Sequence, residues 1–206
     1  MTSRSKTIFS LFIIESLEFR DEQKLRFEGK LLTDILRMSR QGIEVEYLYI
    51  RTHKELSVAL KRFHRSKKRY LHISCHGNPD EIGLTLDTVP FDDFADEIAP
   101  YMDLRQRLFF SACSVVNKKL ATAVMRASGC QSVIGPKEDI SFGDAALMWA
   151  SFYHLMFRDK DQDKMTSGKI GWALRRIHYA FQREFVYFTR ADNDQCWKEV
   201  DVNRRD

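Results

Sequence analysis

The chain has 206 residues, a net charge of +4, 44% hydrophobic residues and 12% aromatic residues. A chain of this size buries a substantial core, and one domain over residues 1–206 is expected. No apolar run approaches the roughly 18 residues that cross a bilayer, so the sequence predicts no membrane span. The charge is too small to indicate a nucleic-acid partner by itself.

The N-terminal stretch MTSRSKTIFSLFIIES resembles a signal peptide in its basic start and apolar run. Glu15 follows the run and no small-residue cleavage site does, so a buried first strand over residues 7–15 is the preferred interpretation. The four cysteines form no CxxC pair and no disulfide framework. With no export signal, this pattern predicts reduced thiols in the cytoplasm.

The next elements alternate between helix and strand. Asp21 is expected to cap a helix over residues 22–41. Residues 43–50 alternate between polar and apolar side chains, which is typical of a strand at a sheet edge. Thr52 with Glu55 three residues later predicts the capping box of a second helix.

The same alternation continues to the end of the chain. Two apolar runs, over residues 70–77 and 108–113, predict buried strands. Between them, turn signals predict a small hairpin arm, and apolar spacing predicts a short helix. The later elements are expected to be a helix over 115–128, a strand over 131–136, a buried helix from near Asp144, a loop over 158–164, a last helix over 166–185 and terminal strands near 186–190 and 196–202. This order predicts an α/β fold, a three-layer α/β/α sandwich with a mostly parallel central sheet.

Two reactive side chains stand where the buried strands are expected to stop. These are His76, in YLHISCHG, and Cys113, in LFFSAC. In an open parallel sheet, ligands bind in the crevice outside the carboxyl ends of the strands. Catalysis by a thiol nucleophile requires at least a thiol and a nearby base, and an imidazole that faces the same crevice can act as this base.

The HxxxHG pattern (His72, His76, Gly77) followed by SAC (Ser111 to Cys113) resembles the caspase-like (clan CD) cysteine peptidases, closest to the bacterial CHAT branch. A weaker similarity lies in the stretch IGPKEDISFGDAALMWASFYHLMF. The caspase signature around the cysteine is not met, because the run here is SACSV. The separation between the histidine and the cysteine is also shorter than the roughly 50 residues of caspases.

The resemblance implies a peptidase mechanism without a cofactor or a metal. Cys113 attacks the scissile carbonyl, and His76 protonates the leaving amine and then activates water. The backbone N–H groups of Gly77 and Cys113 are expected to hold the oxyanion. No third acidic residue is nominated.

Relatives bind the side chain that precedes the cut in a pocket formed partly by the loops after the first strand and after the cysteine. Here these loops offer Glu15, Glu138, Asp139 and Asp144. Such acidic groups select Arg or Lys by charge pairing, and Asp139 is the first choice. Alternatively, Asp144 and Ser141 cap the buried helix.

The other histidine and cysteines have a simpler interpretation. His72 is expected to be a satisfied core histidine, and Cys75, Cys130 and Cys196 are expected to pack or to lie on the surface. A zinc site built from Cys75, His76 and Cys113 lacks the short ligand spacing of structural zinc sites.

A cytoplasmic endopeptidase of a protein substrate is the main hypothesis. The resemblance implies control by a regulatory or sensor protein and a role in bacterial defence or programmed death. One alternative is a catalytically inactive interaction module on the same fold. The other is a nucleic-acid-binding protein that uses the basic run 61–69 with Arg175 and Arg176.

Overall fold

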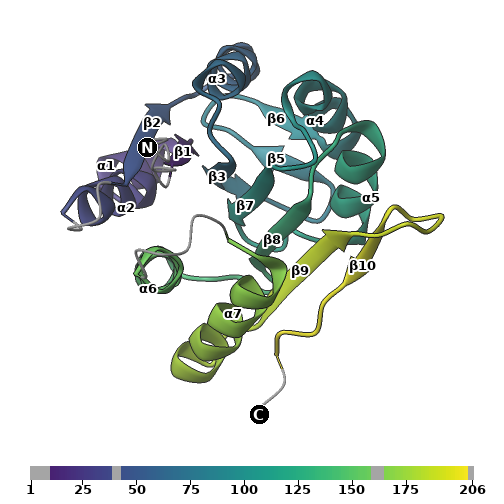
Figure 1. The fold of residues 1–206 in the computed structure, drawn as a ribbon. Helices are drawn as coiled ribbons and strands as arrows, with labels where there is room; N and C mark the ends of the chain where they lie inside the picture. Colours follow the sequence, from purple (N-terminus) through teal and green to yellow (C-terminus); the bar gives the residue numbers. More distant parts are fainter. Residues whose placement is uncertain (1–9, 39–42, 159–164, 204–206) are drawn as a thin grey trace, which may run out of the picture.

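The computed structural model describes residues 10–38, 43–158 and 165–203. Its centre is a seven-stranded sheet with helices on both faces (Figure 1). Five neighbouring strands run parallel, and the last two complete one edge in antiparallel fashion. In spatial order the strands are β2 (Glu44–Tyr49), β1 (Ser10–Glu15), β3 (Tyr70–Ser74), β7 (Arg107–Ser111), β8 (Ser132–Pro136), β9 (Phe185–Arg190) and β10 (Trp197–Glu199).

The helices form two layers, one on each face of the sheet. One hydrophobic cluster lies under α3 (His53–Ser66), α4 (Phe91–Ile98) and α5 (Lys118–Ala127). The other lies under α2 (Glu28–Arg37), α6 (Phe142–Phe157) and α7 (Ser167–Phe181). The short helices α1 (Phe19–Gln23) and η1 (Ala99–Tyr101) complete the set in the described residues. This architecture confirms the predicted α/β/α sandwich with a mostly parallel sheet.

The α6 helix is apolar nearly all round because it is buried between α2, α7 and the sheet. Phe109 of β7 is fully buried beneath it. Its ring lies 5.5 Å from that of Phe152 and 5.9 Å from those of Trp149 and Tyr153. Aromatic pairs at this spacing add to the stabilisation that area burial alone provides.

Several local predictions are confirmed. Thr52 and Glu55 form the capping box of α3, and β2 lies at an edge of the sheet. The arm after the histidine strand is a separate antiparallel sheet of three short strands, and the C-terminal pieces are β9 and β10. The arm consists of β4 (His76–Gly77), β5 (Glu81–Gly83) and β6 (Thr88–Pro90).

The prediction of a single helix over residues 22–41 is wrong. Helix α1 ends at Gln23, Leu25 adopts a left-handed φ of 55°, and α2 starts at Glu28. A left-handed backbone cannot continue an α-helix, and here it turns the chain sharply. Asp21 therefore lies inside α1 and is buried, so it does not cap the longer helix.

Two other helices are shorter than expected. The helix predicted over 115–128 starts at Lys118, because Asn117 accepts hydrogen bonds from the backbone of the first turn. The last helix ends at Phe181, where Gln182 adopts a left-handed φ of 55°. The predictions for residues 7–9, 39–41 and 159–164 lie outside the described residues. No helix in the described ranges is long and apolar enough to cross a membrane.

Candidate active site

His76 is not the tip of a strand of the large sheet, because β3 ends at Ser74 and His76 begins the small sheet as part of β4. Gly77 lies very close to the chain that follows Cys113. A Cβ atom added to Gly77 would lie 2.3 Å from Val115 Cγ2 and 2.8 Å from the Glu81 carbonyl oxygen. Only glycine permits this approach, so the HG dipeptide holds the histidine arm against the cysteine loop.

Cys113 follows β7, the strand next to β3. Ser74 and Ser111 are paired residues in the parallel register. The two segments that carry His76 and Cys113 therefore leave the sheet side by side. Ser114 has a left-handed φ of 55°, which is uncommon for a residue other than glycine. Strained backbone of this kind clusters at functional sites, and here it forms the turn that carries the thiol.

The helix expected directly after Cys113 is separated from it by a loop, since α5 starts at Lys118. Asn117, and not the thiol, accepts the hydrogen bonds of the first turn of this helix. The half-buried thiol instead donates to the Ile140 carbonyl oxygen, 3.8 Å from the sulfur. Burial raises the pKa of Cys113, the Ile140 bond lowers it and the Asp139 carboxylate raises it, so that it lies above its usual value. The resting group is consequently a neutral thiol at pH 7.

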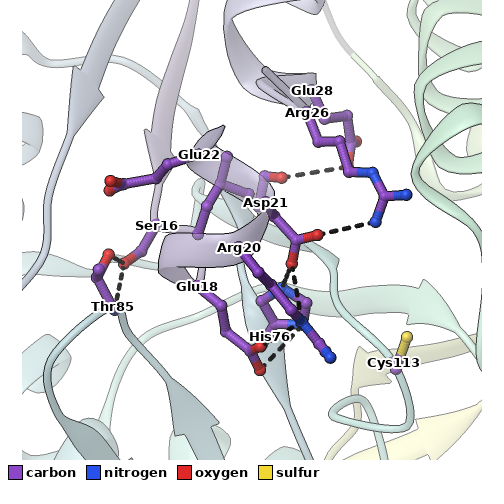
Figure 2. A network of polar contacts seen from close by, with 12 residues as sticks. Ser16, Glu18, Arg20, Asp21, Glu22, Arg26, Glu28, His76, Thr85 and Cys113 are labelled. Atoms are coloured by element: carbon purple, nitrogen blue, oxygen red, sulfur yellow. Dashed lines mark hydrogen bonds and ion pairs between the residues drawn. The ribbon is translucent and has the colours of Figure 1, made fainter. Parts of the chain in front are cut away.

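Asp21 is the site residue that sequence reasoning missed. One oxygen of this buried carboxylate lies 2.9 Å from His76 Nε2, and the other accepts from Arg26 at 2.8 Å. Figure 2 shows Asp21 between these two side chains, with Cys113 on a neighbouring segment. Burial raises the pKa of Asp21, but the hydrogen bonds from Arg26 and His76 outweigh burial and hold the pKa below its usual value. The carboxylate therefore stays charged beside the imidazole.

The bond to Asp21 determines which ring nitrogen is available for chemistry. With Nε2–H donating to Asp21, Nδ1 is the nitrogen left to exchange protons. Glu18 Oε1 lies 4.0 Å from Nδ1, and the ring of Phe142 packs edge-on with its centre 5.5 Å from that of the imidazole. The ring is thus held by α1 on one side and by the start of α6 on the other.

The acidic residues suggested for a substrate pocket lie in three different settings. Asp139 is exposed beside the cysteine loop, and its carboxylate accepts from Ser114 Oγ at 3.2 Å. Glu138 is also exposed. Asp144 forms an ion pair with Arg183 at 3.2 Å in the first turn of α6, whose cap is Ser141.

Glu15 lies in the interior and not in a pocket, because it has no exposed surface. Its carboxylate accepts hydrogen bonds from the backbone N–H of Gly29 at 2.7 Å, from that of Lys30 at 3.3 Å and from the Tyr47 hydroxyl at 2.7 Å. Glu15 thus caps the N-terminus of α2 across a long sequence distance, where the helix dipole favours a negative charge. Burial raises its pKa, and these hydrogen bonds oppose the increase.

The remaining histidine and cysteines lie largely as expected. His72 is fully buried with Nδ1 2.9 Å from the Tyr153 hydroxyl, Cys75 and Cys130 are buried, and Cys196 is half-buried. In the described part of the chain, the grouping that could hold a metal is Glu18, Asp21 and His76. Asp21 there is already bound to Arg26, whose positive charge opposes a cation.

No protein-family model and no curated protein matches the chain. Several solved structures, in contrast, match the chain. The inactive zymogen of a C11 protease from Parabacteroides distasonis has a TM-score of 0.61 and 10% identity over 92% of this chain and 63% of that one. A secreted C11 cysteine protease from Bacteroides thetaiotaomicron has a TM-score of 0.57 and 10% identity over 88% of this chain and 66% of that one.

The Arg-specific cysteine proteinase gingipain R has a TM-score of 0.57 and 13% identity, over 88% of this chain and 44% of that one. The chain therefore spans between 44% and 66% of the length of these proteins. At such low identity, the likeness concerns the fold. The chain thus shares the arrangement of its sheet and helices with these cysteine proteases.

Proposed function

We propose that the chain is a cysteine endopeptidase in which Cys113 is the nucleophile, His76 is the general acid and base, and Asp21 orients His76. One observation carries the proposal: a buried carboxylate fixes an imidazole at 2.9 Å beside a loop that bears a thiol. A nucleophile, a base and a group that orients the base form the recurring constellation of acyl-transfer enzymes. The clan CD protease fold supports the same reading.

The neutral resting thiol determines the order of the steps. Because the pKa of Cys113 lies above its usual value, His76 Nδ1 removes the thiol proton as the sulfur attacks the carbonyl carbon. The imidazolium then donates this proton to the leaving amine, and the peptide bond breaks to give a thioester. His76 next takes a proton from water as the water oxygen bonds to the thioester carbon; the C–S bond then breaks, the imidazolium returns the proton to Cys113, and the carboxylic acid product leaves. The backbone N–H groups of Gly77 and Cys113 are our candidates for holding the oxyanion.

We assign Asp139 to recognition of Arg or Lys before the cut. It is exposed, it lies one residue from the carbonyl that binds the thiol, and it contributes to the raised pKa of Cys113. A substrate cation that pairs with Asp139 would neutralise this effect and lower the pKa of the thiol. Recognition of a basic residue and activation of the nucleophile would then occur together.

The wider role follows from the HxxxHG and SAC motifs. Their likeness to the CHAT branch favours a regulated effector that acts on a protein substrate in bacterial defence or programmed death, under a partner protein's control. The four free thiols fit a reducing compartment, and we assign the chain to the cytoplasm. A nucleic-acid role is less favoured, because Arg62 and Lys68 of the basic run already pair with Glu46 and Glu44.

The experiment compares the wild type with Cys113→Ala, His76→Ala and Cys196→Ala on fluorogenic peptides that place Arg, Lys, Asp or Leu before the reporter. Cys196 is the matched control, because it is a second half-buried free thiol. We expect cleavage after Arg and Lys by the wild type and Cys196→Ala, and none by the other two variants. Iodoacetamide should also label Cys113 faster in the wild type than in His76→Ala, because the imidazole takes up the thiol proton as the sulfur reacts.

Wild-type protein that cleaves none of these peptides, together with equal rates of Cys113 labelling in the wild type and in His76→Ala, would leave the inactive interaction module as the better function. Cleavage after Asp or Leu alone would retain the peptidase and remove Asp139 from substrate recognition.

A further inference from the structure

Glu28 is a buried acid beneath the candidate active site that the mechanism above does not use. It is the first residue of α2 and is only 4% exposed. Its Oε2 accepts hydrogen bonds from Ser74 Oγ at 3.1 Å and from Ser111 Oγ at 2.7 Å. A single carboxyl oxygen thus joins two neighbouring strands.

These two serines occupy a special position in the sheet. They are the last residues of β3 and β7, and they face each other in the parallel register. His76 follows two residues after Ser74, and Cys113 follows two residues after Ser111. Beyond this pair, the backbone N–H of Cys75 donates to the Ser111 carbonyl at 3.2 Å. The Glu28 carboxyl therefore ties the strands together at the last point before the reactive residues diverge.

The position of Glu28 is itself firmly fixed. Glu15 at the end of β1 caps the first turn of α2. Gly29 lets the helix lie against β1, since a Cβ atom there would lie 2.9 Å from Ile13 Cγ2. The end of β1 thus places the carboxyl of Glu28 over the ends of β3 and β7.

The chemistry of the group also argues for a specific role. A buried carboxyl destabilises a fold unless its hydrogen bonds compensate, and here Oε1 lies 3.8 Å from His72 Nε2, too far for a hydrogen bond. Burial, with a contribution from the Glu15 charge, raises the pKa of Glu28 to about 8. Burial lowers the pKa of His72 to about 3, so Glu28 faces a neutral imidazole. A leucine would fill this space without these costs.

We propose that Glu28 is a positioning residue of the catalytic pair, which sets the relative placement of His76 and Cys113 by clamping Ser74 to Ser111. The proposal rests on the proposed function, because it assigns to Glu28 a role in that same site.

Two substitutions of Glu28 distinguish its hydrogen bonds to the serines from its packing in the core. Glu28→Gln keeps an oxygen that accepts from both serines, whereas Glu28→Leu keeps the volume and removes the acceptor. Thr33→Val is the matched control, because Thr33 is a buried polar residue of the same helix whose hydroxyl binds only the Gly29 carbonyl within the described hydrogen bonds. Amide-resolved hydrogen exchange reports the strand ends without requiring any substrate.

In Glu28→Leu, we expect exchange at Cys75, whose N–H donates to the Ser111 carbonyl, to quicken about tenfold relative to mid-strand amides such as Ile73. Glu28→Gln and Thr33→Val should retain the wild-type ratio. Equal acceleration along the whole of β3 and β7, or no acceleration, would overturn the clamp.

The second measurement is turnover of the peptide that the wild type cleaves best. Glu28→Leu should lower kcat about tenfold with KM unchanged, and Glu28→Gln should restore it. A Leu variant with wild-type kcat overturns the positioning role. Wild-type protein without any turnover would refute the proposed function alone, and the exchange ratio would still decide whether Glu28 holds the strand ends.

Discussion

The stability of the protein should depend on pH through Glu28, and Glu28→Gln isolates this dependence. The pKa of Glu28 is about 8 in the folded chain, against an ordinary value of 4.5 for a glutamate in the unfolded chain. Between these two values, the folded protein holds a proton that the unfolded chain has lost. Stability is therefore fully present below pH 4.5 and falls as the pH rises toward 8.

The size of this loss of stability follows from the size of the pKa shift of Glu28. Each pH unit within this window costs about 1.4 kcal/mol, so the wild type should lose about 2.7 kcal/mol between pH 5 and pH 7 through this group. Glutamine does not titrate and lacks this loss. The stability of Glu28→Gln relative to the wild type should therefore rise by about 1.4 kcal/mol per pH unit over this range.

Urea unfolding at pH 5, 6 and 7, followed by circular dichroism, measures this difference. Groups common to both proteins cancel, and Thr33→Val, which changes no titrating group, should differ from the wild type by a constant amount. If the wild type and Glu28→Gln give parallel stability curves across this range, Glu28 does not hold a proton in the interior, and the reasoning fails.

Three further predictions concern neighbouring residues. Asp21→Asn should lower kcat about 10²- to 10⁴-fold, because an amide does not hold the catalytic imidazole in the required tautomer. Circular dichroism should show that the variant is folded, and an unchanged kcat would refute the orienting role of Asp21. Gly29→Ala should lower the free energy of unfolding by about 1 to 3 kcal/mol, since the new methyl group would lie 2.9 Å from Ile13 Cγ2, and a neutral result in urea would show that α2 shifts freely. Tyr153→Phe should cost about 1 to 3 kcal/mol by the same assay, because it leaves buried His72 Nδ1 without its partner; a more stable variant would contradict this.

The parallel strands were predictable because their signals are local. Apolar runs that end in turn formers marked β3, β7 and β8, and the capping box marked the start of α3. His76 and Cys113 follow such runs directly. That the two preceding strands, β3 and β7, are neighbours in the sheet follows from the ordinary rules for α/β sandwiches.

The acidic residues were not predictable, because their environment depends on tertiary structure. Asp21 and Glu28 lie in a stretch whose apolar spacing indicates one long amphipathic helix. The helix is interrupted at Leu25, whose apolar side chain is 78% exposed. A glutamate in a first helical turn usually faces solvent, and nothing in the local sequence distinguishes Glu28 from such a residue. Glu15 was assigned to a substrate pocket for the same reason, although its side chain is buried at the end of a strand and caps α2.

The three-stranded arm that carries His76 is hydrogen-bonded as a sheet of its own, whereas Cys113 follows a central strand of the large sheet. The two proposed catalytic residues thus belong to, or follow, strands of two different sheets. The chain segments that carry them approach each other at Gly77 and Val115. Ile82 and Val89 of the arm are buried in the same hydrophobic cluster as Phe110 of β7, so the arm cannot move away from the cysteine strand without exposing core side chains to water.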